Sequence, residues 1–354
     1  REPALVVVHG ESGSGKTRLA DEVVTRTRLE GAAIARIRSV PSDAGAEWSA
    51  LLGLARGGLL DAEGAAIADP RAVAALLDRT GWQDPALREY ASGAAPLAFP
   101  GAFTEVARAV AELRPLVLWI DEADYVDASS LRALPGLVRD LAGTPTTLLM
   151  TMRGYPPSPG MDELRGRVGH DIAGVSIALP PLDLPRMQGL VEVMMPDLGS
   201  TESERLARRI LVDSAGLPLF AVDLLNGVRL GLELEKQESW PEPFRTMDQA
   251  YPGDLPDTVT AAIRIGFRRL SEPAQEVLAA AAVLESPVSS KTLARAIGIE
   301  DAPLSEALDE LEWHRWLSAD ARGYSVVARI VRDVIERDML TSGQRIRIRE
   351  TAGE

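Results

Sequence analysis

Short, continuous runs of apolar residues recur through the first half of the chain. They occupy residues 4–8, 116–120 and 146–152, and weaker patterns occur at 32–40 and 175–179. Continuous apolar runs of this length are typical of strands that are buried on both faces of a sheet. We therefore predict five strands at these positions.

Stretches with helical periodicity separate these runs. Residues 17–27 and 130–141 predict single helices, and residues 47–114 predict a long helical region broken by Gly and Pro clusters. Strands that alternate with helices predict a parallel sheet with helices on both of its faces.

The pattern changes near Pro180-Pro181. Residues from there to about 231 predict helices only, and residues 236–257 are polar and proline-bearing, as a linker would be. The last block predicts helices, then a hairpin within residues 317–327, then one more helix. Helices followed by a small hairpin suggest a winged-helix module. The helices are predicted at 258–270, 273–284, 290–297, 303–316 and 329–340.

Composition removes several classes of protein. The 354 residues contain no cysteine, which excludes disulfide scaffolds, thiolate metal sites and cysteine nucleophiles. They contain only three histidines. No apolar run approaches the ~18 residues of a membrane span, and no signal peptide is visible. We therefore expect a cytoplasmic protein with no membrane partner. The net charge of −14 argues against a general nucleic-acid coat.

The residues after the first predicted strand match the phosphate-binding pattern G-x-x-x-x-G-K-[ST]. A strand before the motif and a helix after it are the context that this motif needs. Glycines let successive backbone N–H groups point at phosphate oxygens, and the helix N-terminus adds partial positive charge. The alternative is a chance turn with a surface lysine. The predicted nucleotide-binding residues are Gly10, Gly13, Ser14, Gly15, Lys16, Thr17 and Arg18.

Within this motif Lys16 is expected to reach the β- and γ-phosphates of ATP, and Thr17 to offer its hydroxyl to Mg²⁺. Lys16 is one of only three lysines, against 35 arginines. That bias is explained by a GC-rich coding sequence, yet the lysine is kept where the motif requires one.

Acidic residues end the strand at 116–120. Asp121 is expected to hold Mg²⁺ through water, and Glu122 to orient the water that attacks the γ-phosphate. Arg153 directly follows the strand at 146–152, where a guanidinium could pair with the terminal phosphate and tell ATP from ADP. The alternative for Asp121 and Glu122 is an acid pair that caps a helix and has no catalytic role. The alternative for Arg153 is a surface arginine that begins a loop.

These residues resemble the STAND ATPases (signal transduction ATPases with numerous domains). Residues 121–131 align with the family's acidic motif through the acids, an aromatic, Asp127 and Ser130-Leu131, and Arg153 aligns with the family arginine. Residues 270–278 and 307–311 resemble the family's winged-helix domain. The G-x-P element, which packs near the adenine in the family, falls on Gly216, Leu217 and Pro218. Taken alone, that triplet is better explained as a helix-ending turn.

The resemblance implies an α/β fold: an AAA-like, parallel-sheet P-loop NTPase followed by a helical lid and a winged-helix domain. The expected boundaries are 1–180 for the nucleotide-binding domain, 181–235 for the lid, 236–257 for the linker and 258–354 for the winged helix. One departure is that Ala328 stands where many relatives carry a histidine that locks the ADP-bound form. Arg329, the next residue, would point about 100° away on a helix.

Three functions remain open at this stage. The first is a slowly hydrolysing ATPase switch, in which ADP/ATP exchange opens the lid and winged helix, drives homo-oligomerisation and activates effector or sensor domains outside residues 1–354. The second is an ATPase whose winged helix binds DNA. The third is a nucleotide-binding scaffold without useful turnover. The arginines that motivate the second are Arg264, Arg268, Arg269, Arg345, Arg347 and Arg349.

Overall fold

The structure is a computed structural model that describes residues 4–153, 159–229, 257–284, 287–320 and 323–353. It divides into two compact units, Arg1–Pro180 and Pro181–Glu354. The linker predicted at 236–257 and the tip of the predicted hairpin, residues 321–322, lie almost wholly outside the described residues.

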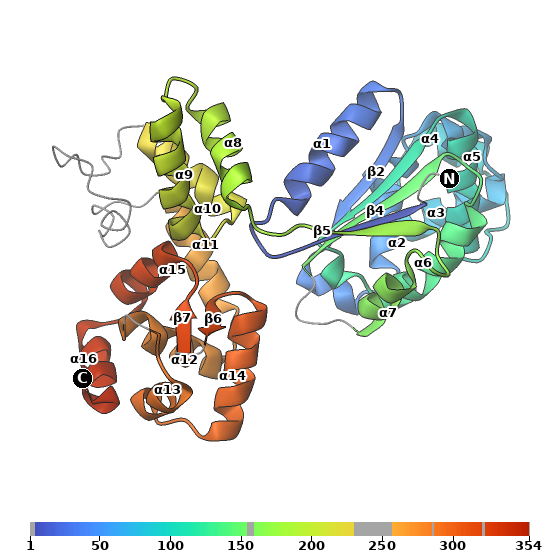
Figure 1. The fold of residues 1–354 in the computed structure, drawn as a ribbon. Coiled ribbons are helices and arrows are strands. Elements are labelled where there is room, and N and C mark those ends of the chain that lie inside the picture. The colour runs from blue at the N-terminus through green and yellow to red at the C-terminus, as the bar shows by residue number, and fades with distance from the viewer. Residues whose placement is uncertain (1–3, 154–158, 230–256, 285–286, 321–322, 354) are drawn as a thin grey trace. The chain divides into compact units, whose positions relative to one another are not determined.

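The first unit is built on a parallel sheet of five strands, as predicted, and its strand order is β2-β3-β4-β1-β5 (Figure 1). Strand β3 and its neighbour β4 are almost wholly buried, which agrees with their continuous apolar sequences. The strands are β1 (Leu5–His9), β2 (Ala33–Arg38), β3 (Leu116–Asp121), β4 (Thr146–Met152) and β5 (Gly174–Ala178).

Alternate strand residues point to two different cores. In β3, Leu118 and Ile120 join the larger core, whereas Val117 and Trp119 join a smaller one beneath α1 (Lys16–Leu29). Helices α2 (Ser49–Leu54), α5 (Gly101–Leu113) and α6 (Ala128–Asp140) contribute to the larger core. Figure 1 shows α1 on one side of the sheet and α2 and α6 on the other. Helices on both faces were predicted from the alternating pattern.

The edge strand β2 is shielded by a tight turn of helix η2 (Ala55–Leu59). A Cβ added to Gly57 would lie 2.0 Å from the backbone oxygen of Arg36, and one added to Gly58 would lie 2.2 Å from that of Ile34. Only glycine permits this approach, and the covered edge cannot pair with another strand. The other helices of this unit are η1 (Pro41–Gly45), η3 (Glu63–Ile67), α3 (Pro70–Thr80), α4 (Pro85–Tyr90), η4 (Ala123–Tyr125) and α7 (Pro159–Arg167).

The second unit begins with helices only, as predicted. They are α8 (Leu184–Met194), α9 (Ser200–Ser214) and α10 (Pro218–Arg229). Helices α11 (Asp257–Arg268), α12 (Glu272–Val283), α13 (Ser290–Ile297) and α14 (Asp301–Trp313) follow. One apolar core runs through both groups, from Met187 in α8 to Ala352 near the end. The division into lid, linker and winged-helix domain stays a prediction.

An antiparallel hairpin of β6 (Leu317–Asp320) and β7 (Gly323–Val326) follows α14, where the sequence predicted it. Next come α15 (Arg329–Val334) and η5 (Ile335–Met339), which together occupy the predicted last helix. Helix α16 (Ser342–Ala352) was not predicted, and neither was α7. Among the described residues, no helix has the length and apolar character needed to cross a membrane.

Candidate nucleotide-binding site

The phosphate-binding motif forms the turn between β1 and α1. Gly13 and Gly15 take φ values of 84° and 92°, which favour glycine, and Gly15 directly precedes the helix. A Cβ on Gly10 would lie 2.8 Å from the backbone oxygen of Leu179. The hydroxyl of Ser14 is buried and makes no hydrogen bond within the described residues. A glycine-shaped turn with an unused buried donor at a helix N-terminus suits an anion.

Lys16 lies in the first turn of α1 and folds back over the loop. Its Nζ donates hydrogen bonds to the backbone oxygens of Gly10, at 3.0 Å, and Glu11, at 2.6 Å. Burial, helped by the nearby charge of Arg153, lowers the pKa of Lys16 against the opposing effect of Asp124. The ammonium group is therefore held among the loop carbonyls, at the place where the motif needs a cation.

Asp121, at the end of β3, accepts hydrogen bonds from two threonines. Thr17 Oγ1 lies 2.9 Å from Asp121 Oδ1, and the Thr151 hydroxyl donates to the same oxygen. Residue Asp121 is 4% exposed. Hydroxyl and carboxylate oxygens are the ligands that Mg²⁺ takes beside substrate phosphates, so Thr17 and Asp121 fit this ion. No cluster of three or more acidic or histidine ligands occurs among the described residues, so an all-protein metal cage is absent from that part of the chain.

Glu122 forms an ion pair that the sequence analysis missed. Arg38 Nη2 donates to Glu122 Oε1 at 2.8 Å, and Arg38 Nε lies 3.9 Å from Asp121 Oδ2. Arg38 ends β2 and is opposite Asp121 in the parallel register. Its pKa is raised by the hydrogen bond to Glu122, so the guanidinium stays charged. An alignment of the ends of adjacent predicted strands would have revealed this pair, but strand order is not visible in the sequence.

Arg153 follows β4 and is held by Asp124 and Tyr125, the last two residues of η4. Its backbone N–H donates to Asp124 Oδ2 at 2.9 Å, and its Nη2 donates to the Tyr125 hydroxyl. The guanidinium carbon lies 5.2 Å from the centroid of the Tyr125 ring. Arg153 is therefore a positioned side chain rather than a solvated surface arginine.

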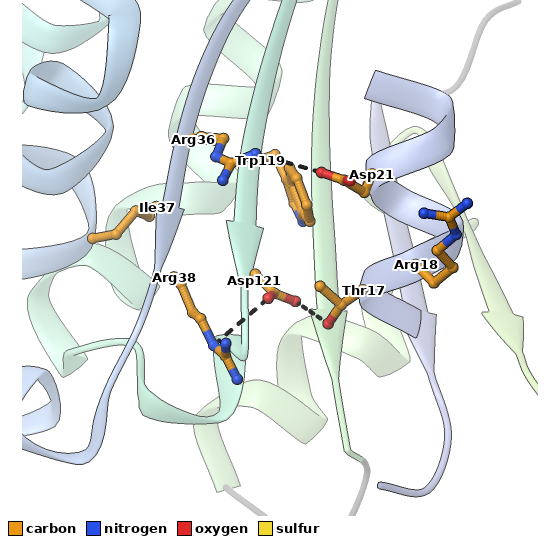
Figure 2. Close-up of a pocket in the computed structure, with 8 residues that line it drawn as sticks. All are labelled: Thr17, Arg18, Asp21, Arg36, Ile37, Arg38, Trp119 and Asp121. Atoms are coloured by element: carbon orange, nitrogen blue, oxygen red, sulfur yellow. Dashed lines mark hydrogen bonds and ion pairs between the residues drawn. The ribbon is translucent and has the colours of Figure 1, made fainter. Parts of the chain in front are cut away.

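A pocket of about 380 Å³ opens beside α1, on the face of the sheet that carries Trp119 (Figure 2). Asp121 and Thr17 lie at one end of this pocket, joined by their hydrogen bond. Arg36 pairs with Asp21 at 3.4 Å at the other end. Arg18, predicted to bind nucleotide, is exposed on α1 and lines this pocket. The full lining is Thr17, Arg18, Asp21, Arg36, Ile37, Arg38, Trp119 and Asp121.

The structure gives Gly216 a local role. Gly216 has φ 72°, and a Cβ there would lie 2.4 Å from the backbone oxygen of Leu182, so glycine is required by the turn itself. Pro218 begins α10 in the second unit. A contact between Pro218 and nucleotide stays a prediction. Ala328 is buried at the start of α15 and offers no polar side chain, and the side chain of Arg329 lies outside the described residues.

Asp127, one of the acids in the family-like stretch, stabilises the fold instead of facing the phosphate loop. It caps α6 by accepting from the Ser130 N–H at 2.8 Å. It also accepts from the N–H groups of Trp48 and Ala50, at 2.9 and 3.2 Å. His9 ends β1 beside the loop, and burial lowers its pKa, so it is neutral near pH 7.

Comparisons with known proteins agree with this geometry. Residues 1–150 match the family model of an AAA ATPase domain. An uncharacterized protein of Rhizobium meliloti (strain 1021) is 26% identical over 312 residues, which is 81% of this chain. The chain spans only 28% of that relative's length.

Two solved structures align with most of this chain, and the first of them is similar in fold. A Walker-type ATPase of Pyrococcus abyssi aligns with a TM-score of 0.53 at 16% identity, over 94% of this chain and 91% of that one. A STAND protein with a tetratricopeptide repeat sensor from Pyrococcus horikoshii aligns at 15% identity over 98% of this chain and 42% of that one. Its TM-score of 0.36 is too low to support an argument about class. The findings support a P-loop ATPase whose first unit has the AAA-type NTPase fold.

Proposed function

We propose that this chain is a nucleotide-driven switch of the STAND kind. ATP and ADP would compete for the loop at Lys16, hydrolysis would be slow, and exchange would change the conformation of the second unit and its tendency to oligomerise. One observation carries the proposal. The phosphate loop and the acids after β3 meet at the carboxyl ends of the parallel strands, where Arg38 holds Glu122. The residues that meet there are Lys16, Thr17, Asp121 and Glu122.

Each residue has a distinct part in this proposal. Lys16 would bind the terminal phosphates, and Mg²⁺, held by Thr17 and Asp121, would supply charge neutralisation to the phosphates when bound. Glu122 would orient the attacking water. Arg153 would pair with the γ-phosphate and so distinguish ATP from ADP. Only a group that contacts the γ-phosphate can give the two nucleotides different effects on conformation.

The ion pair between Arg38 and Glu122 supports slow turnover. The charge-assisted hydrogen bond at 2.8 Å stabilises the negative charge of Glu122 at Oε1 and so makes the carboxylate a weaker acceptor for a water proton. Hydrolysis would then wait for the pair to open. A reset step that is slow compared with nucleotide exchange is what a switch needs.

The DNA-binding alternative is disfavoured by the charges of the second unit. Helix α14 precedes the hairpin and would be the recognition helix of a winged-helix module, yet it has five acidic residues and no lysine or arginine. A helix of this charge repels phosphates. The arginines that suggested DNA binding are partly engaged: Arg264 pairs with Asp338 at 3.4 Å, and Arg349 pairs with Glu336 at 3.2 Å.

Three hypotheses are separated by one set of measurements on the purified chain. We expect slow phosphate release by the wild type, and loss of release with retained ATP binding in Glu122→Gln. No release above background by the wild type would favour the scaffold. We also expect different light-scattering masses or radii with a non-hydrolysable ATP analogue and with ADP, and identical values would refute the switch. A DNA mobility shift that weakens steeply with salt would revive the DNA-binding alternative.

The nucleotide that remains bound through purification provides an independent check. We expect retained ADP if a closed resting state exists despite the absence of the histidine at Ala328. Protein purified without nucleotide would contradict a closed, ADP-bound resting state.

A further inference from the structure

The side chain of Arg153 is held by two consecutive residues, Asp124 and Tyr125. Both lie in η4, just after the acids that end β3. Asp124 Oδ2 accepts the Arg153 backbone N–H at 2.9 Å and lies 3.7 Å from Arg153 Nε. The Tyr125 hydroxyl accepts from Nη2, and its ring lies beneath the guanidinium at 5.2 Å. The plane and the position of the guanidinium are therefore both fixed.

The surroundings of Arg153 are those of a side chain with unused binding capacity. Its side chain is 20% exposed, and that of Asp124 is 12% exposed. Arg153 Nε is buried and makes no hydrogen bond within the described residues. A guanidinium has five N–H donors, and Tyr125 accepts from only one of its nitrogens, so other donors remain for a ligand.

These three residues also lie close to the phosphate loop. Strands β1 and β4 are paired in parallel with His9 opposite Met152, so Gly10 of the phosphate loop and Arg153 directly follow paired residues at the same end of the sheet. Asp124 accepts from the Arg153 backbone there, and the Tyr125 hydroxyl accepts from its guanidinium. Arg153 and its two partners therefore border the place where the terminal phosphates would bind.

We propose that Asp124 and Tyr125 are positioning residues that hold Arg153 in the orientation needed to read the terminal phosphate, and so set the preference for ATP over ADP. The inference rests on the role proposed above for Arg153. A free arginine loses side-chain entropy when it is fixed. A side chain that is already fixed does not lose this entropy when nucleotide binds. The resulting gain in affinity therefore applies only to the nucleotide that Arg153 contacts.

The inference predicts an effect on one nucleotide and not on the other. Tyr125→Phe keeps the ring beneath the guanidinium and removes only the hydroxyl acceptor. We expect Tyr125→Phe to weaken ATP binding about 3- to 10-fold and ADP binding less than 2-fold, and Asp124→Asn to shift the ratio in the same direction. A mere loss of stability would weaken the binding of both nucleotides together.

The chain offers a matched control. Tyr90 donates its hydroxyl to the backbone oxygen of Ala68 at 2.7 Å, in the first unit and away from the phosphate loop. Tyr90→Phe also removes a single tyrosine hydroxyl, and we expect it to leave both affinities unchanged. The full chain would be titrated with ADP and with a non-hydrolysable ATP analogue, and thermal unfolding would check each variant.

Arg153→Ala completes the experiment and separates two kinds of failure. Suppose that Arg153→Ala lowers the ratio of ATP to ADP affinity. The positioning role is then wrong if Tyr125→Phe leaves this ratio unchanged, whether it changes neither affinity or lowers both equally. If Arg153→Ala itself leaves the ratio unchanged, Arg153 does not read the terminal phosphate and the inference falls with that role. Nucleotide binding by Lys16 and turnover by Glu122 would still stand as separate results.

Discussion

The pair of Arg38 and Glu122 leads to a prediction that runs against the usual effect of a mutation at an active site. Arg38→Ala removes the donor that occupies the Glu122 carboxylate, and we expect ATP hydrolysis to become faster. The carboxylate would then be free to orient water in every molecule. Most substitutions beside a catalytic group reduce its activity, so an increase would be diagnostic.

The size of the increase follows from the strength of the pair. Two unit charges 2.8 Å apart attract by about 6 kcal/mol at an effective dielectric constant of about 20. The Arg38 side chain is 68% exposed, however, and exposed pairs contribute about 0.2–1 kcal/mol after desolvation and entropy costs. At about 1 kcal/mol, Glu122 is free in about one molecule in six. Removing Arg38 should therefore raise kcat by up to about six-fold.

The assay is steady-state phosphate release at saturating ATP. Arg26→Ala is the matched control, because Arg26 forms an exposed ion pair of similar length with Glu22, at 2.9 Å, on α1 and outside the lining of the pocket. We expect Arg26→Ala to leave kcat unchanged. A lower kcat in Arg38→Ala with an unchanged KM would show that Arg38 assists the reaction, and the reasoning would be refuted. An unchanged kcat would show that opening of the pair does not limit turnover.

Two further substitutions test the loop and the fold. Lys16→Ala should lower nucleotide affinity at least ten-fold by calorimetry, whereas Lys291→Ala on α13 should not change it. Asp127→Asn should cost about 2–4 kcal/mol of stability at pH 7 in urea unfolding, because one acceptor oxygen replaces two that bind buried N–H groups. Burial opposes ionisation of Asp127, but its hydrogen bonds outweigh burial and lower its pKa. The wild type should therefore lose this stabilisation only as pH falls below about 4, and the variant should not; an equal acid response in both would contradict this assignment.

The order of strands and helices in the first unit was predictable because its signals are local. A run such as residues 146–152 is long, apolar and bounded by turn residues, and the phosphate motif needs only a strand before it and a helix after it. Helix α16 was missed because arginines alternate with other residues there and leave no broad apolar face; only Ala352 in it is buried. Helix α7 was missed because it is short and its residues are mostly polar or glycine.

The candidate site was only partly predictable. Lys16, Thr17, Asp121, Glu122 and Arg153 were predicted as site residues from motifs and from their places at strand ends. Arg38 could not be, because it is 84 residues from Glu122 and meets it only through the order of strands in the sheet. The acid at 127 lies in a family-like stretch, yet its burial and its bonds to α2 reveal a structural role that its sequence neighbours do not indicate.

The sequence by itself determined the phosphate-binding turn, the alternation of strands and helices, and the acids at the end of β3. These depend on residues that are close together in the chain, where side-chain type and backbone conformation are directly linked. Tertiary structure alone decided that Arg38 holds Glu122, that Thr151 joins Thr17 on Asp121, and that Tyr125 supports Arg153. Such contacts require strands β2, β3 and β4 to lie side by side, and that arrangement is selected by burial of the whole sheet rather than by any one segment.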